Sequence, residues 1–211
     1  MKIAFINGSP KFKDSASGML LTMAKEYLGE AETEEFICNK TQLEEHIIQR
    51  IFNADAILFS FPLYVDSIPS HLLRCMVQMQ QYIEAHPLEH KPMVYTIVNN
   101  GFFDGKQNRF AIENIKHWSH RCGLLFGQGV GIGGGGMAAS LVSIPGENGP
   151  KKNVAFAIKT MCDHITNRAF GEIIAVEPNF SRFAYRYMAQ LGWRQGIKKN
   201  GLKVKDLSLQ R

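Results

Sequence analysis

The chain has 211 residues, 45% of them apolar and 20% charged, and it carries a formal net charge of +5 at pH 7. This composition is typical of a soluble globular protein, and the length suits one domain with an appendage. No apolar stretch reaches the roughly 18 residues of a transmembrane helix, and the N-terminal apolar run is too short for a signal peptide, so we expect a cytoplasmic protein.

Strands and helices are predicted to alternate along most of the chain. Apolar runs of strand length lie at residues 2–6, 34–38, 55–60, 92–98 and 124–132. Apolar residues at helical spacing predict helices at 17–28, 41–51, 69–79, 111–121 and 154–168. Thr41 and Glu44 have the spacing of a capping box, and Pro69 suits a first helical turn.

Such alternation indicates an α/β protein with a parallel sheet and helices on both faces. Right-handed crossovers and five strands favour the doubly wound order 2-1-3-4-5. This order brings the carboxyl ends of strands 1, 3 and 4 together, and we expect a binding crevice there.

The loop after the first strand, INGSPKFKDSASG, is predicted to hold an anion. It enters a helix N-terminus, where unpaired N–H groups and the helix dipole favour negative charge. Gly8 allows a tight turn, Ser9, Ser15 and Ser17 supply hydroxyl groups, and Lys11 supplies a positive charge. The alternative is a capped turn in which Ser15 or Ser17 only satisfies the helix start. The loop lacks the P-loop and G-x-G-x-x-G patterns.

Two further loops are expected at the same edge of the sheet. The loop after the third strand is apolar, lies between Pro62 and Pro69 and carries Tyr64, whereas the loop after the fourth strand reads NNGFFDG at 99–105. A ligand that fits all three loops has a phosphate at one end and a flat, hydrogen-bonding ring at the other. Flavin mononucleotide (FMN) is such a ligand.

These motifs resemble the NAD(P)H-dependent FMN reductase family of flavodoxin-like proteins, over about residues 1–168. The resemblance implies a flavodoxin-like, doubly wound α/β sandwich with a five-stranded parallel sheet. It also implies that the FMN phosphate is held by Ser9, Lys11, Ser15 and Ser17. The isoalloxazine is then lined by Pro62, Leu63, Tyr64 and Val65, partly through backbone N–H groups, and its other edge is faced by Asn99, Asn100, Gly101 and Phe102. Lys11 stands where many relatives have arginine. Lysine keeps the positive charge but cannot make the bidentate contact with a phosphate that arginine makes.

The implied activity is hydride transfer from NAD(P)H through bound FMN to a small acceptor, namely a quinone, an azo or nitro compound, or a flavin. Because the cofactor carries this chemistry, no catalytic side chain is predicted. The family tendency suggests a homodimer. Two alternatives stay open, a flavodoxin-type electron carrier and a non-enzymatic flavodoxin-like interaction protein. Carriers of this type are usually acidic, and this chain is not.

The cysteines and histidines show no pattern typical of a metal site. Cys38, Cys75, Cys122 and Cys162 are scattered without a Cys-x-x-Cys pair, which argues against zinc and iron–sulfur sites, and we expect buried thiols. No metal is predicted.

The C-terminal segment differs in charge from the rest of the chain, so we divide the chain into a domain at 1–178 and a tail at 179–211. From Phe180 onward the net charge is +7, which leaves −2 for residues 1–179. Apolar residues at helical spacing from Phe180 to Leu191 predict a basic amphipathic helix. We expect this helix to cover the sheet edge or a second subunit, with membrane-surface binding as the alternative. No nucleic-acid partner is predicted, since the tail shows no recognised DNA or RNA motif.

Overall fold

The structure is a computed structural model of the chain that describes residues 1–11, 13–40, 42–135, 148–179 and 181–208. The chain divides into two compact units, Met1–Pro178 and Asn179–Arg211.

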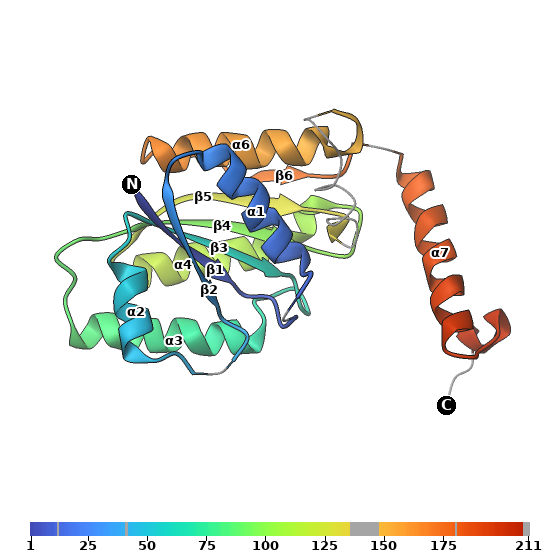
Figure 1. Cartoon of the computed structure of the whole chain (residues 1–211), viewed down its shortest axis with the longest axis horizontal. Coiled ribbons are helices and arrows are strands. Elements are labelled where there is room, and N and C mark those ends of the chain that lie inside the picture. Colours follow the sequence, from blue (N-terminus) through green and yellow to red (C-terminus); the bar gives the residue numbers. More distant parts are fainter. Residues whose placement is uncertain (12, 41, 136–147, 180, 209–211) are drawn as a thin grey trace. The chain divides into compact units, whose positions relative to one another are not determined.

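The first unit is built on a parallel sheet whose described strands number six, in the order β2-β1-β3-β4-β5-β6 (Figure 1). The strands are β1 (Lys2–Asn7), β2 (Glu32–Ile37), β3 (Ala56–Pro62), β4 (Met93–Asn99), β5 (Leu125–Ile132) and β6 (Ile174–Val176). The flavodoxin-like class and the order of the first five strands are confirmed, but the prediction of five strands is wrong. Strand β6 pairs with β5 at Val130–Ile132 and extends the sheet at that edge.

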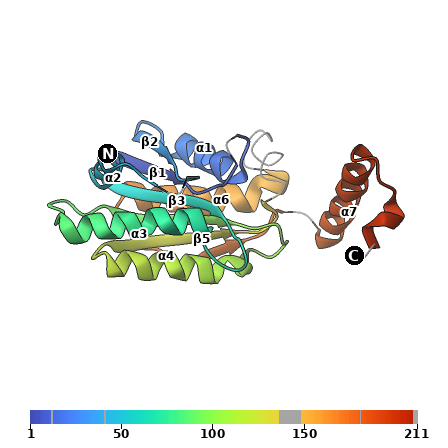
Figure 2. The ribbon, with the colours of Figure 1, turned by 90° about the horizontal axis from the view of Figure 1, so that it is seen from below.

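Helices cover both faces of the sheet, as predicted. On one face lie α1 (Ala16–Leu28) and α6 (Lys152–Thr166), and on the other lie α2 (Glu45–Phe52), α3 (Ser70–Ala85) and α4 (Arg109–Arg121) (Figures 1 and 2). Short 3₁₀ turns, η1 (Gly105–Asn108) and η3 (Gly149–Lys151), precede α4 and α6. Each face has its own apolar cluster, and strands β1, β3 and β4 contribute to both clusters. This double burial explains the nearly continuous apolar runs in these strands.

Several helix boundaries differ from the predicted ones. Helix α2 begins at Glu45 rather than near residue 41, and Glu44 is its N-cap without a side-chain cap hydrogen bond. Thr41, on which the predicted capping box depends, lies outside the described residues. Pro69 immediately precedes α3, in agreement with its predicted place at a helix start.

The second unit contains α7 (Arg182–Lys199) and the 3₁₀ turn η4 (Val204–Ser208). Ser181 caps α7 by accepting a hydrogen bond from the Ala184 N–H at 3.1 Å. The described residues of α7 include none that is buried, and its large apolar side chains Phe183, Tyr187, Met188 and Trp193 are all exposed. Phe180, where the predicted helix begins, lies outside the described residues. A search of the described residues finds no helix long and apolar enough to cross a membrane.

Candidate functional site

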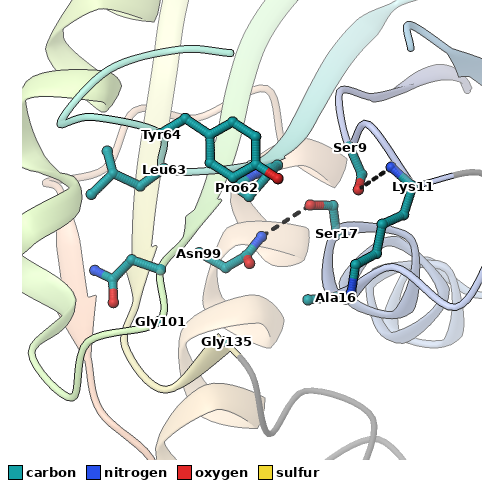
Figure 3. A pocket seen from close by; sticks show the side chains of 11 residues that line it. Ser9, Lys11, Ala16, Ser17, Pro62, Leu63, Tyr64, Asn99, Gly101 and Gly135 are labelled. Carbon is teal, nitrogen blue, oxygen red and sulfur yellow. Dashed lines mark hydrogen bonds between the residues drawn. The ribbon is translucent and has the colours of Figure 1, made fainter. Parts of the chain in front are cut away.

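A cavity lies at the carboxyl edge of β1, β3 and β4, where the three predicted loops meet (Figure 3). Its volume is about 200 Å³. The described residues that line it are Ser9, Lys11, Ala16, Ser17, Pro62, Leu63, Tyr64, Asn99, Asn100, Gly101 and Gly135. Nine of the twelve predicted cofactor-binding residues are therefore brought together, while Ser15, Val65 and Phe102 lie outside this lining.

The first loop ends in a capped helix whose first N–H groups remain available. The Ser15 hydroxyl accepts from the Gly18 N–H at 3.0 Å, and the Ser15 carbonyl accepts from the Met19 N–H at 3.0 Å. Helical geometry gives the N–H groups of Ala16 and Ser17 no intrahelical acceptor. Ser15 therefore satisfies the helix start, as in the capped-turn alternative, while its neighbours Ala16 and Ser17 line the cavity, where an anion site stays a prediction.

A strap of hydrogen bonds ties the three loops together. The buried Asn99 amide donates to the Ser17 hydroxyl at 3.0 Å (Figure 3). It also donates to the Phe61 carbonyl at 3.1 Å. The Ser60 hydroxyl donates to the Ser17 carbonyl at 3.0 Å, and the Gly8 N–H donates to the Ser60 carbonyl at 2.8 Å. Because these partners come from three different strand ends, the cavity wall is held in place before any ligand binds.

The second loop closes on itself in a tight turn. The N–H and carbonyl of Tyr64 bond to the carbonyl and N–H of Ser67, both at 3.1 Å, and the two residues between them have left-handed backbones, with φ of 49° at Val65 and 57° at Asp66. The Leu63 N–H donates to the Asn99 carbonyl at 2.7 Å. Among the four residues expected to line a ring partly through backbone N–H groups, Pro62 has no N–H, and the N–H groups of Leu63 and Tyr64 donate to protein carbonyls. The Tyr64 ring faces the cavity in Figure 3, whereas the Leu63 side chain extends away from it and packs against the apolar core.

The third loop contributes amide groups. The Asn100 side chain donates to the Asp104 carbonyl at 3.1 Å, and its Oδ1 is buried with no partner among the described residues. A buried acceptor without a partner is uncommon in native proteins and suits a ligand that carries an N–H donor. Phe102 is exposed rather than part of the wall.

Lys11 carries the only charge among the described residues that line the cavity. Its ammonium group and the N-terminus of α1 act in the same direction, since both favour an anion at the first loop. Pro62, Leu63 and Tyr64 form the apolar side of the cavity, and the Tyr64 ring faces it in Figure 3. The residues present therefore fit a ligand with a phosphate and an apolar, hydrogen-bonding ring, which is the chemistry of FMN.

The family model described as NADPH-dependent FMN reductase matches residues 1–147, a range that contains all three loops. The chain belongs to this family. As an FMN reductase it is an oxidoreductase with FMN as cofactor and NAD(P)H as hydride donor, which confirms the predicted cofactors. When bound, FMN supplies the transfer of electrons between the nicotinamide and an acceptor.

Solved structures support the fold of this FMN reductase. An NAD(P)H:quinone oxidoreductase from Methanothermobacter marburgensis is 14% identical to this chain, with a TM-score of 0.58; the match covers 78% of this chain and 96% of the oxidoreductase. An FMN-dependent NADH-azoreductase from Bacillus anthracis, solved in complex with FMN, is 15% identical to this chain, with a TM-score of 0.53; the match covers 79% of this chain and 100% of the azoreductase. The flavodoxin of Streptococcus pneumoniae is 10% identical to this chain, with a TM-score of 0.52; the match covers 79% of this chain and 99% of the flavodoxin. A comparison with curated protein sequences finds no match.

Two residues that line the FMN reductase cavity were not predicted from the sequence. Ala16 is the first residue of α1, and its place between Ser15 and Ser17 is the signal that could have indicated it. At Gly135 a Cβ atom would lie 2.8 Å from both the Asn100 carbonyl oxygen and Asn99 Oδ1, so the close approach of two chain segments requires glycine there. That contact joins β4 to the segment after β5, and no local pattern reveals it.

Proposed function

We propose that this FMN reductase transfers hydride from NAD(P)H through FMN to a small, flat acceptor, either a quinone, an azo or nitro compound, or free flavin. The observation that carries the proposal is the cavity itself, which has a positive, hydrogen-bond-donating end at Lys11 and α1 and an apolar, aromatic side at Tyr64. A bound ring with one face toward solvent can be reached in turn by nicotinamide and by an acceptor.

In this proposal the FMN phosphate lies at the first loop, held by Ser9, Lys11 and Ser17 and by the N–H groups of Ala16 and Ser17. Ser15 acts indirectly, because its hydroxyl is already used to cap α1. The ring lies between two walls, formed by Pro62, Leu63 and Tyr64 on one side and by Asn99, Asn100 and Gly101 on the other. Val65 and Phe102 are assigned to the rim, where an acceptor would meet them, since both are strongly exposed.

The test is an absorbance spectrum of the purified protein after incubation with FMN and desalting, followed by anaerobic addition of NADPH and then NADH. We expect a retained flavin band that bleaches within the time of one turnover, and reoxidation when a quinone, an azo dye, a nitroaromatic or free FMN is added. A retained band that stays oxidised would indicate an electron carrier. If no band is retained, only the fold stands, and an interaction protein becomes the better hypothesis.

We also propose that residues 1–178 form the FMN-binding domain and that the tail supports a homodimer in the cytoplasm. The exposed apolar side chains of α7 support a contact with a second copy, because side chains of this kind are normally covered. The four free, buried cysteines support a reducing compartment. Sedimentation of the full chain and of a variant ending at residue 178 tests the dimer, and an equally stable dimer without the tail contradicts this role.

A further inference from the structure

The last residue of β1, Asn7, lies outside the cavity lining but holds the first loop. Its side-chain Nδ2 donates to Glu35 Oε1 at 2.9 Å, and its Oδ1 accepts from the Ser9 N–H at 3.1 Å. A carboxylate only accepts hydrogen bonds and a backbone N–H only donates them, so the Asn7 amide has a single allowed orientation. Glu35, on the neighbouring strand β2, therefore helps to hold the amide with its Oδ1 toward Ser9.

The hydrogen bonds continue from Ser9 into the cavity wall. The Ser9 hydroxyl accepts from the Lys11 N–H at 3.2 Å, so two of the first-loop residues that line the cavity, Ser9 and Lys11, are connected to Glu35 through Asn7. The space around the amide is tight, since a Cβ atom at Gly18 would lie 3.1 Å from Asn7 Nδ2. The backbone of Asn7 is fixed as well, because its carbonyl accepts from the Cys38 N–H at 2.8 Å. The side chain thus has little freedom except to rotate its amide.

We propose that Glu35 and Asn7 are positioning residues for the phosphate end of the cavity. Glu35 orients the Asn7 amide, and the amide holds Ser9 where its hydroxyl and the following Lys11 meet the phosphate. This inference rests on the proposed placement of FMN. It assigns a role in cofactor binding to a carboxylate on the exposed edge strand, far from the ring and with the same sign of charge as the phosphate.

The direction in which FMN affinity changes when Glu35 is removed distinguishes a positioning role from a purely electrostatic one. If Glu35 acted only through its charge, its removal would relieve repulsion and tighten FMN binding. If it acts by orienting Asn7, its removal weakens FMN binding, because the amide loses one of the two hydrogen bonds that fix it and holds the Ser9 N–H less firmly. Riboflavin has the same ring without the phosphate, so its affinity reports on the rest of the cavity.

The experiment measures the Kd of FMN and of riboflavin by quenching of flavin fluorescence in the full-length protein and its variants. We expect Glu35→Ala to raise the Kd of FMN about fivefold, the loss of one partly exposed hydrogen bond, with riboflavin affinity changed less than about twofold. Asn7→Ala should have at least the same effect. Glu35→Gln should restore wild-type affinity, since the glutamine Oε1 accepts the same hydrogen bond.

Glu32→Ala is the matched control. It removes one negative charge from the same strand, and the Glu32 side chain has no partner among the described residues. An equal effect of Glu32→Ala and Glu35→Ala on the Kd of FMN overturns the proposal, as does a riboflavin Kd that rises in parallel. If the wild-type chain binds neither flavin, the proposed function falls together with this inference. If the wild-type chain binds FMN and Glu35→Ala binds it with the same Kd, only the positioning role is overturned.

Discussion

The strap between the loops leads to a prediction about stability in the cofactor-free protein. In Asn99→Ala two hydrogen bonds from the buried amide are lost, those to the Ser17 hydroxyl and to the Phe61 carbonyl. Each such bond contributes about 1 kcal/mol, and leaving buried partners unsatisfied adds about 1 kcal/mol or more. We therefore expect the free energy of unfolding to fall by about 3 kcal/mol, and Tm to fall by roughly 6–12 °C for a chain of this length.

Asn100→Ala is the matched control for this prediction. The two asparagines are adjacent and equally buried, with exposed fractions of 4% for Asn99 and 3% for Asn100. The Asn100 side chain loses only its bond to the Asp104 carbonyl, and the substitution also removes a buried Oδ1 that has no partner among the described residues. The expected loss is about 1 kcal/mol or less. Urea denaturation followed by circular dichroism compares the two variants, and an Asn100→Ala variant that is as destabilised as Asn99→Ala refutes the reasoning.

Three further predictions concern charge, pH and packing. Lys11→Gln should raise the Kd of FMN about fivefold at low ionic strength, and the difference should shrink at about 0.5 M salt and be absent for riboflavin, as flavin fluorescence titrations would show. Tyr95→Phe should cost about 1 kcal/mol near neutral pH, because the buried hydroxyl bonds to the carbonyls of His164 and Ala169 at 3.0 Å. Burial raises the pKa of Tyr95 to about 12, so the unfolded chain loses this proton first as pH rises above its ordinary value of about 10. The wild-type advantage over Tyr95→Phe should therefore fall between about pH 10 and 12, by up to about 1.4 kcal/mol per pH unit, and should reverse in sign before pH 12. Urea titrations that give a constant difference contradict this. Gly127→Ala should destabilise the fold by about 1–3 kcal/mol, since a Cβ atom there collides with the Tyr95 ring, whereas Gly101→Ala, with open space around the position, should change the Tm by less than about 2 °C.

The place of the first loop in the candidate site could be predicted because its signal is local. Glycine, serine and lysine between a buried strand and a helix indicate an anion site whatever the rest of the chain does. The backbone donors of the second loop could not be predicted, since the acceptors of Leu63 and Tyr64 are the carbonyls of Asn99 and Ser67. Whether an N–H group is free for a ligand depends on these partners, which only the folded chain brings close.

Strand β6 escaped prediction for a similar reason. Its three residues are all partly exposed, so they form no long apolar run, and they become a strand through pairing with Val130–Ile132. Gly105 shows how closely β6 packs, because a Cβ atom there would lie 2.8 Å from the backbone nitrogen of Val176. Short edge strands that depend on their neighbour carry little signal of their own.

The Asn99–Ser17 hydrogen bond also has a consequence for how the protein acquires its cofactor during synthesis. The two residues are 82 positions apart in the chain, so the first loop leaves the ribosome well before the strand that straps it down. Contacts of such large sequence separation form late in folding. A nascent chain that ends before β4 therefore holds the first loop only through the bonds that involve Ser60 and lacks those of Asn99, so the complete cavity wall forms only after β4 has been synthesised.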